Sequence, residues 1–354
     1  MQQETRSRHL PSGVPAAPIT TADAWIGSEL QNADAWIYRL TPADISELVA
    51  ALSHARTHKG GRGAWNVGDF PLPTLGPRIH GWLTELDRGR GFILIKGFPV
   101  ERHSEADCEA IYWGIGLHLG RAVSQNTEGD VIGHIRDTGA DPAQYGVRLY
   151  KTRAEQDFHT DGADIIGLFC LRTAKSGGVS RIVSSPSIFN RMLAERPDLV
   201  PVLFDPFPFD TQGQHKPGAK PWFDLPLCRF TDGRLRTFFI PWYIRESQQH
   251  AACPRLTQAQ QEAVAFIERT ANDPNLTLDM NFEPGDMQFL KNAAVLHKRT
   301  AYEDWPEAER KRHLLRLWLV AEDFSAGDPA LRAGVARNAV TAASQAQGTQ
   351  GRRK

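Results

Sequence analysis

The segment from Arg312 to Val320, RHLLRLWLV, constrains the fold of this 354-residue chain more than any other. In a β-strand, successive side chains point to opposite faces. One face would carry Arg312, Leu314, Arg316 and Trp318, and the other would carry His313, Leu315, Leu317 and Leu319. Large apolar residues on both faces predict a strand that is covered on both sides. A buried guanidinium is costly unless it meets an anion, so the two arginines predict a β-barrel interior that receives an anionic ligand.

Two alternatives to the anion hypothesis stay open at this point. The arginines would form structural salt bridges if they lay at the rim of the barrel. They would face outward if the strand had the opposite register. A dicarboxylate ligand accounts for both arginines more simply, because a guanidinium binds a carboxylate through two parallel hydrogen bonds.

The remaining periodicity predicts more strands than helices. Strands are expected at 91–98, 165–174, 180–185, 236–244, 276–282 and 286–292. Helices are expected after the capping residues Thr41, Ser104, Ser185 and Thr257. The strands concentrate after about residue 145, with helices before and between them. We therefore expect a mainly β fold with flanking helices, built on a double-stranded antiparallel core rather than on βαβ units.

Composition excludes several other classes of protein. Lys and Arg number 41, as do Asp and Glu, and this balance argues against a nucleic-acid partner or an anionic membrane surface. The four cysteines are far apart, and no apolar stretch is long enough to span a membrane. We expect one domain over 21–324 between disordered tails at 1–20 and 325–354, in a soluble, cytoplasmic protein. A homo-oligomer is possible, although no heptad or exposed apolar stripe indicates one.

The strongest chemical motif is His159-Thr160-Asp161, followed much later by His297. In an extended segment His159 and Asp161 point to the same side. Two histidines and one carboxylate can occupy one face of an octahedral Fe(II) and leave three positions open. Such a tripeptide also occurs by chance, and isolated histidines are often surface or hydrogen-bonded core residues. The motif alone therefore does not establish a metal site, and the surrounding sequence is needed to support it.

That surrounding sequence resembles a known enzyme family. The segments FHTDGADIIGLFCLRTAKSGGVSRIVSS and EPGDMQFLKNAAVLHKRTAYEDWPEAERKRHLLRLWL, with GRGFILIKGFP upstream, are similar to the iron(II)/2-oxoglutarate dioxygenases of the taurine dioxygenase/TfdA-like group. The resemblance spans roughly residues 90 to 320. It implies a double-stranded β-helix, also called a jelly roll or cupin-like fold. It also implies hydroxylation of a small organic substrate, coupled to conversion of 2-oxoglutarate and O2 to succinate and CO2.

The resemblance assigns roles to individual residues. His159, Asp161 and His297 match the iron ligands of the family. Ser180 stands where the family has a threonine that helps to hold the distal carboxylate of 2-oxoglutarate, and Arg312 matches the arginine that pairs with that carboxylate. Arg316 matches a second arginine, which meets the sulfonate in the taurine enzyme.

The substrate is less well defined by the sequence. The family's substrate-contacting His and Tyr have no match near residue 125, where Gln125 and Asn126 suggest neutral polar contacts instead, so taurine is disfavoured. Trp242 and Tyr243 are candidate pocket residues, unless they serve only in packing. If Arg316 faces the pocket, a substrate carboxylate is its natural partner.

The sequence leaves two other functions open. The same His/Asp/His set could hold zinc in a hydrolase or lyase, or the barrel could bind a small molecule without catalysis. Dependence on 2-oxoglutarate separates the first alternative from an oxygenase. The three intact metal positions count against the second.

Overall fold

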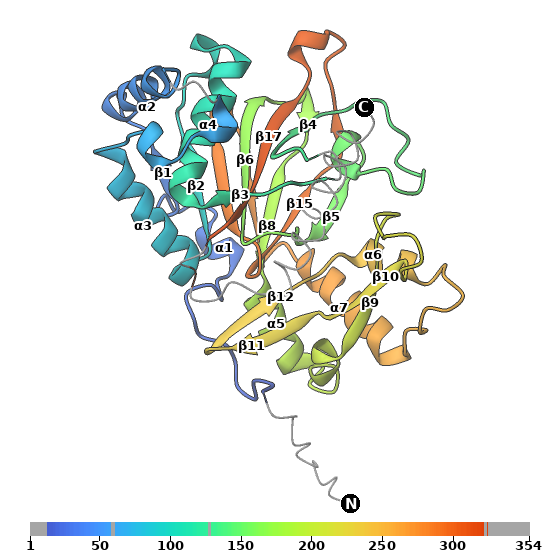
Figure 1. The fold of residues 1–354 in the computed structure, drawn as a ribbon. Coiled ribbons are helices and arrows are strands. Elements are labelled where there is room, and N and C mark those ends of the chain that lie inside the picture. The colour runs from blue at the N-terminus through green and yellow to red at the C-terminus, as the bar shows by residue number, and fades with distance from the viewer. Residues whose placement is uncertain (1–12, 58–60, 127–128, 322–323, 325–354) are drawn as a thin grey trace, which may run out of the picture.

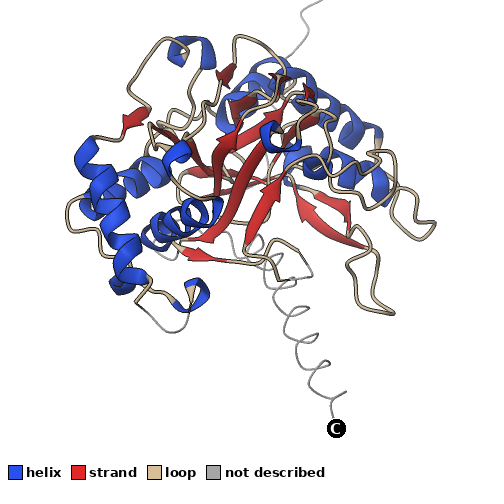
Figure 2. Ribbon diagram, turned by 90° about the horizontal axis from the view of Figure 1, so that it is seen from above, coloured by secondary structure: helices blue, strands red, loops and turns tan. Residues whose placement is uncertain are grey.

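The computed structural model describes residues 13–57, 61–126, 129–321 and 324. Two sheets form its centre and face each other across a partly polar interior (Figure 1). One contact across that interior joins Ser180 of the smaller sheet to Gln288 of the larger sheet. Seen from above, helices flank the strands on two sides (Figure 2). The predicted mainly β fold with flanking helices is confirmed at this level.

The larger sheet contains seven strands. Its order is β1 (Ile37–Arg39), β2 (Phe92–Lys96), β14 (Met287–Lys291), β6 (Ile165–Arg172), β17 (His313–Val320) and β3 (Arg121–Ala122), with β4 (Ile132–Ile135) also paired to β17. The pairs are antiparallel except for β1 and β2. Because β17 lies between β6 on one side and β4 and β3 on the other, its backbone is fully enclosed.

The smaller sheet contains four antiparallel strands. Its order is β13 (Thr277–Met280), β8 (Ser180–Ser184), β15 (Val295–Arg299) and β5 (Gln156–His159). Three two-stranded ribbons complete the β structure: β9 (Pro206–Asp210) with β10 (Trp222–Pro226), β11 (Cys228–Thr231) with β12 (Arg234–Thr237), and β7 (Ser176–Gly177) with β16 (Tyr302–Glu303).

Helices cover the outer faces of both sheets. Besides the short α1 (Gly27–Leu30), helices α2 (Pro42–Ala55), α3 (Leu75–Arg88) and α4 (Glu105–Leu119) pack beside the larger sheet, and α5 (Ser185–Glu195), α6 (Pro241–Ser247) and α7 (Gln258–Ala271) lie near the smaller sheet (Figure 1). No helix of the described residues is both long and apolar enough to cross a membrane.

Several local expectations hold at the predicted residues. Thr41, Ser104 and Thr257 each form a capping box at the start of a helix. Strand β17 alternates as expected: Leu315, Leu317 and Leu319 belong to the core that includes α4, and their neighbours point to the other side.

Two boundaries differ from the expectations. The expected strand over 236–244 ends at Thr237, and helix α6 begins at Pro241, because a proline fits the first helical turn and lacks the N–H that a strand ladder needs. Ile19, inside the expected tail 1–20, is buried. Its N–H donates to Asn190 Oδ1 and its carbonyl accepts from Asn190 Nδ2, so the packed chain begins before residue 21. The expected tail segments 1–12 and 325–354 lie outside the described residues.

Candidate active site

The smaller sheet brings the two predicted metal-binding histidines together. His159 ends strand β5, and His297 lies directly opposite it in the antiparallel register on β15. Their ring centroids are 4.2 Å apart. Asp161 follows His159 by two residues, and one donor atom from each of the three side chains lies within 4.8 Å of the others. All three residues are buried, so the chain has already assembled a compact N,N,O donor set.

Backbone contacts hold the loop that carries Asp161. The buried amide of Asn292 accepts a hydrogen bond from the Asp161 N–H at 2.7 Å and donates one to the Asp161 carbonyl at 2.7 Å. The Thr160 N–H donates to the Phe239 carbonyl at 2.8 Å, and the Thr160 hydroxyl accepts from the Phe239 N–H at 2.9 Å. These contacts fix the direction of the Asp161 side chain without using its carboxylate.

The Asp161 carboxylate is held as an anion. Burial alone would raise its pKa, but Arg316 and His297 overcome that effect and hold the pKa well below the ordinary value. One carboxylate oxygen lies 3.4 Å from Arg316 Nη1, 3.6 Å from His297 Nε2, and accepts a hydrogen bond from Trp318 Nε1 at 3.1 Å. An ionised carboxylate beside two imidazoles suits a divalent cation.

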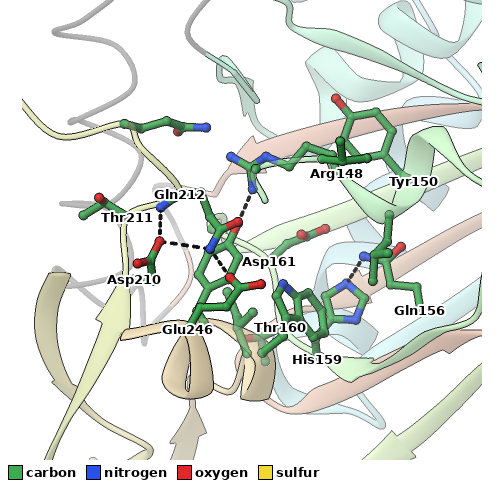
Figure 3. A pocket seen from close by; sticks show the side chains of 18 of the residues that line it. Arg148, Tyr150, Gln156, His159, Thr160, Asp161, Asp210, Thr211, Gln212 and Glu246 are labelled. Carbon is green, nitrogen blue, oxygen red and sulfur yellow. Dashed lines mark hydrogen bonds between the residues drawn. The ribbon is translucent and has the colours of Figure 1, made fainter. Parts of the chain in front are cut away.

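The tautomer of His159 follows from its partners. Its Nδ1 lies 2.7 Å from the Asp157 carbonyl, which can only accept, so Nδ1 carries the proton and Nε2 is unprotonated. That Nε2 now faces the Gln156 amide nitrogen at 3.0 Å (Figure 3). Burial, followed by the charge of His297, lowers the pKa of His159 to about 3 and keeps it neutral. His297 Nδ1 is buried without a hydrogen-bond partner among the described residues.

A second group of donors lies on the outer face of the larger sheet. Glu105, His134 and His313 also bring donor atoms within 4.8 Å of one another. There, however, His134 Nδ1 is 2.9 Å from His313 Nε2, and the Arg172 guanidinium is 3.1 Å from His313 Nδ1. In this outer group Glu105 is exposed and His134 is half-buried, whereas all three residues of the inner group are buried. The inner group, which is enclosed and contains an ionised carboxylate, is the better fit for a metal ion.

Arg316 lies at the wall of the metal group and is well partnered. Its Nε donates to Gln125 Oε1 at 2.7 Å, while the Gln125 amide donates back to the Arg316 carbonyl at 2.8 Å. The guanidinium also stacks between the rings of Tyr150 and Trp318, at 4.8 and 4.9 Å from their centroids. Gln125 thus holds Arg316 in place, a role that differs from the predicted substrate contact.

Arg312 lies deeper in the interior and is poorly partnered. It is buried, and its Nη1 has no hydrogen-bond partner among the described residues. Burial lowers the pKa of Arg312. Burial, together with the neighbouring charge of Arg312, lowers the pKa of Arg299 to about 10. Both guanidinium carbons lie about 5 Å from the ring of Tyr302 (5.1 and 5.0 Å). Two buried cations with unpaired N–H groups favour an anion at this position.

The Gly177-Gly178-Val179-Ser180 segment shapes the space around Arg312. Gly178 has φ of +70°, and a Cβ there would come 2.9 Å from Arg312 Nε. Glycine is therefore needed at this position for two reasons: it adopts the positive φ without strain, and it leaves room for the Arg312 guanidinium. The Ser180 hydroxyl pairs with the Gln288 amide. Contact of Ser180 with a cosubstrate stays a prediction.

A cavity of about 440 Å³ opens beside His159 and Asp161 (Figure 3). Trp242 and Tyr243, predicted as pocket residues, both line it, as do Gln125 and Arg316. Asn126 does not line it. The Asn126 amide donates to Asp130 at 2.8 Å within a local turn, and the structure therefore gives no support to Asn126 as a substrate contact.

Sequence reasoning missed four residues of the site. Asn292 and Trp318 contact Asp161 from other elements, and Arg148 and Glu246 line the far part of the cavity. Only Trp318 carried a usable signal, since it shares the predicted inner face with Arg316. The other three lie outside the motifs, in a turn, a loop and a short helix.

Comparison with known proteins identifies the family. Residues 54–318 match the family model described as taurine catabolism dioxygenase TauD, TfdA family. The chain belongs to the TauD/TfdA family. It is 29% identical over 311 residues to FR-33289 synthase of Streptomyces rubellomurinus, covering 86% of this chain and 91% of that protein. It is 30% identical over 338 residues to the taurine hydroxylase-like protein SAT17 of Stachybotrys chartarum, covering 87% and 85%.

Solved structures share the fold of this TauD/TfdA member. Asparagine oxygenase in complex with Fe(II), 3-hydroxyasparagine and succinate superposes with a TM-score of 0.60 at 17% identity, covering 81% of this chain and 94% of that one. The non-heme iron oxygenase OrfP with Fe and α-ketoglutaric acid gives the same values. The predicted family and enzyme class, an iron(II)- and 2-oxoglutarate-dependent dioxygenase, are confirmed, and the zinc hydrolase and non-catalytic alternatives are not favoured.

Proposed function

We propose that His159, Asp161 and His297 bind one Fe(II), and that the adjoining cavity is where the substrate is hydroxylated. The observation that carries this proposal is the convergence of three buried donors, of which His159 has an unprotonated Nε2 and Asp161 is ionised. Three protein ligands on one side of the ion leave room for small molecules on the other. When bound, iron(II) and 2-oxoglutarate supply the oxidising chemistry, consuming O2 and releasing succinate and CO2.

The two facing sheets form, in this proposal, the double-stranded β-helix of the family. Strand β15 supplies His297 and β5 supplies His159 from the smaller sheet, whereas β17 supplies Arg316 from the larger sheet. Residues on both inner faces thus converge on one interior. A site built on paired strands holds its ligands more firmly than one built on loops.

Arg312 binds the distal carboxylate of 2-oxoglutarate, with Ser180 as a second donor. The unpaired Arg312 Nη1 supports this role, because an incoming carboxylate would satisfy a buried donor that otherwise has none. Arg299, whose Nε and Nη1 also have no partner among the described residues, adds positive charge beside it. The space next to Gly178 leaves the guanidinium unobstructed.

The residues around the metal group orient it. Asp157 sets the position of His159, Asn292 sets that of Asp161, and Trp318 donates to the Asp161 carboxylate. Such supporting contacts fix the tautomer and direction of metal ligands. Trp242 packs edge-on against the His159 ring at 5.1 Å and limits access of water from that side.

The substrate class is a small polar molecule that carries an anionic group. Names of similar proteins support this class: two uridine-5'-phosphate dioxygenases, 26% and 25% identical over about half of this chain, are named for a phosphate ester. The solved oxygenases hold hydroxylated asparagine and arginine, which carry a carboxylate.

An anaerobic titration tests the iron and cosubstrate assignments together. Fe(II) and then 2-oxoglutarate are added to the apo-protein while the visible absorption is recorded. We expect a weak charge-transfer band that requires both additions, at one equivalent of each, and that His159→Ala abolishes. His134→Ala, on the outer face, is the matched control and should keep the band. Tight zinc binding without any band would overturn the proposal.

A further inference from the structure

We propose that Arg148 binds the anionic group of the substrate and that Glu246, across the same cavity, accepts an N–H from it. This inference rests on the proposed function and names the two residues that select the substrate. The molecule that fits is small and carries a carboxylate or phosphoryl group and, apart from it, an ammonium or amide N–H.

Arg148 is the available cation of the cavity. Two arginines, Arg148 and Arg316, line it, and no lysine does so among the described residues. Arg148 donates one hydrogen bond, to the Tyr243 hydroxyl, and its guanidinium lies 5.9 Å from the centre of that ring. No carboxylate lies within ion-pair distance of it in the described part of the chain. Its remaining N–H groups can therefore bind an anion in the forked geometry that guanidinium prefers.

Arg316 is less suited to this task than the sequence suggested. Its Nε is taken by Gln125, its Nη1 lies 3.4 Å from Asp161, and the rings of Tyr150 and Trp318 lie within 5 Å of the guanidinium carbon. Arg316 instead balances the charge of Asp161. The substrate anion is therefore expected at Arg148, on the side of the cavity away from the metal group.

Two carboxylates line the same cavity as Arg148 and differ in their partners. Asp210 is fully buried and satisfied, accepting from the Gln212 N–H at 2.6 Å, His250 Nε2 at 2.6 Å and the Tyr145 hydroxyl at 2.9 Å. Glu246 accepts from the Gln212 side chain alone among the described residues. Figure 3 shows Glu246 directed toward the same pocket as Arg148 and His159.

Glu246 thus has spare acceptor capacity in a partly buried position. Burial, with the charge of Asp210, raises the pKa of Glu246, and the hydrogen bond from Gln212 and the charge of Arg148 offset this only in part. A substrate N–H would supply a further hydrogen-bond donor, and an ammonium group would also supply charge. Gln212 is held at φ of +55° by its bonds to Asp210, and this conformation directs its amide toward Glu246.

Calorimetric binding to the protein loaded anaerobically with Fe(II) and 2-oxoglutarate tests the inference. Matched pairs of probes are used: the L-amino acids against their methyl esters, uridine 5'-phosphate against uridine, and acetate and inorganic phosphate as minimal anions. We expect binding by anionic members, from either the carboxylate or the phosphate arm. Arg148→Met should weaken it about 30-fold, the value of charge-assisted hydrogen bonds. The members that lack an anionic group, the methyl esters and uridine, should bind weakly to the wild type, and Arg148→Met should not weaken their binding further.

Lys151→Met is the matched control, because it removes one positive charge from the same segment outside the cavity lining. It should bind the anions like the wild type. Glu246→Gln should weaken amine-bearing probes about 10-fold and leave acetate unaffected.

Three results would overturn the inference. The first is equal binding of the probes with and without an anionic group, and the second is undiminished anion binding by Arg148→Met. The third is the absence of binding heat from every anion, acetate and phosphate included. In each case the 2-oxoglutarate affinity separates the two claims. If the wild type and Arg148→Met bind 2-oxoglutarate equally well, only the role of Arg148 has failed. If the wild type does not bind it, the proposed function has failed.

Discussion

The two faces of strand β17 show how this protein divides stability from function. The outer face places Leu315, Leu317 and Leu319 in the main hydrophobic core against helix α4. The inner face places Arg316 and Trp318 around Asp161. Both faces are buried, but only the inner one contains charges that are costly to bury.

This difference predicts opposite consequences for substitutions only one residue apart. Outer-face changes should lower the free energy of unfolding and leave ligand affinities intact. Inner-face changes should reduce ligand affinities. At Arg312 they should also leave the free energy of unfolding unchanged or higher, because a buried cation without an anion is removed. Stability and activity often oppose each other at such sites.

The largest effect is expected from Arg312→Met, at the inner end of the strand. Loss of a buried guanidinium–carboxylate pair should weaken 2-oxoglutarate binding about 1000-fold. The unfolding free energy of the apo-protein should not fall, because Arg312 Nη1 has no partner to lose among the described residues. Anaerobic titration and urea denaturation measure the two quantities. An unchanged 2-oxoglutarate affinity would show that the cosubstrate binds elsewhere.

Leu317→Ala tests the outer face. The side chain is fully buried, and a Cβ added at Gly116 of α4 would come 2.9 Å from Leu317 Cδ1, which shows how closely the helix approaches. Truncation should lower the free energy of unfolding by about 3 kcal/mol through the cavity it leaves. Affinities for Fe(II) and 2-oxoglutarate should stay within about threefold of the wild type, since additive effects are expected for sites that share no partner. A large loss of affinity would contradict the division between faces.

Trp318→Phe removes a single inner-face contact. It deletes the 3.1 Å hydrogen bond to Asp161 and keeps an aromatic ring. Fe(II) affinity should fall about 10-fold, as for other groups that orient metal ligands. Trp242→Phe is the control, because Trp242 touches the His159 ring by its edge without a hydrogen bond to the metal group. Equal losses in both variants would indicate a packing effect instead.

The smallest effect concerns pH and the outer-face residue His313. Burial, followed by the charges of His134 and Arg172, lowers its pKa to about 3. Between this value and about 6.5 the unfolded chain binds a proton at His313 that the folded protein does not, so stability falls as pH decreases. Between pH 6.5 and 5.5, the free energy of unfolding should therefore fall by about 1 kcal/mol less in His313→Gln than in the wild type. Urea denaturation at both values measures this difference, and an unchanged pH dependence would contradict it.

The sequence predicted the inner surface well because strand periodicity specifies direction. Arg316 and Trp318 alternate with leucines over one uninterrupted strand, and His159 and Asp161 are two residues apart. A period of two therefore placed Arg316 and Trp318 correctly without knowledge of the rest of the fold. Asp161 lies in the loop after β5, so its position beside His159 follows from its closeness in sequence and not from the strand period.

The far wall of the cavity could not be predicted in the same way. Arg148, Asp210 and Glu246 come from a loop, a strand end and a short helix that meet only after folding. The segment around Pro241 read as a strand because its aromatic run favours β structure, whereas proline begins a helix there. Loops and helix starts depend on tertiary contacts that a local pattern does not contain.

The most direct test of the account is anomalous diffraction at the iron edge from crystals grown anaerobically with Fe(II). The described residues contain two groups of three donors, one on each side of the larger sheet. We predict one strong peak within bonding distance of His159, Asp161 and His297. A peak at Glu105, His134 and His313, with none at the inner group, would contradict the central claim.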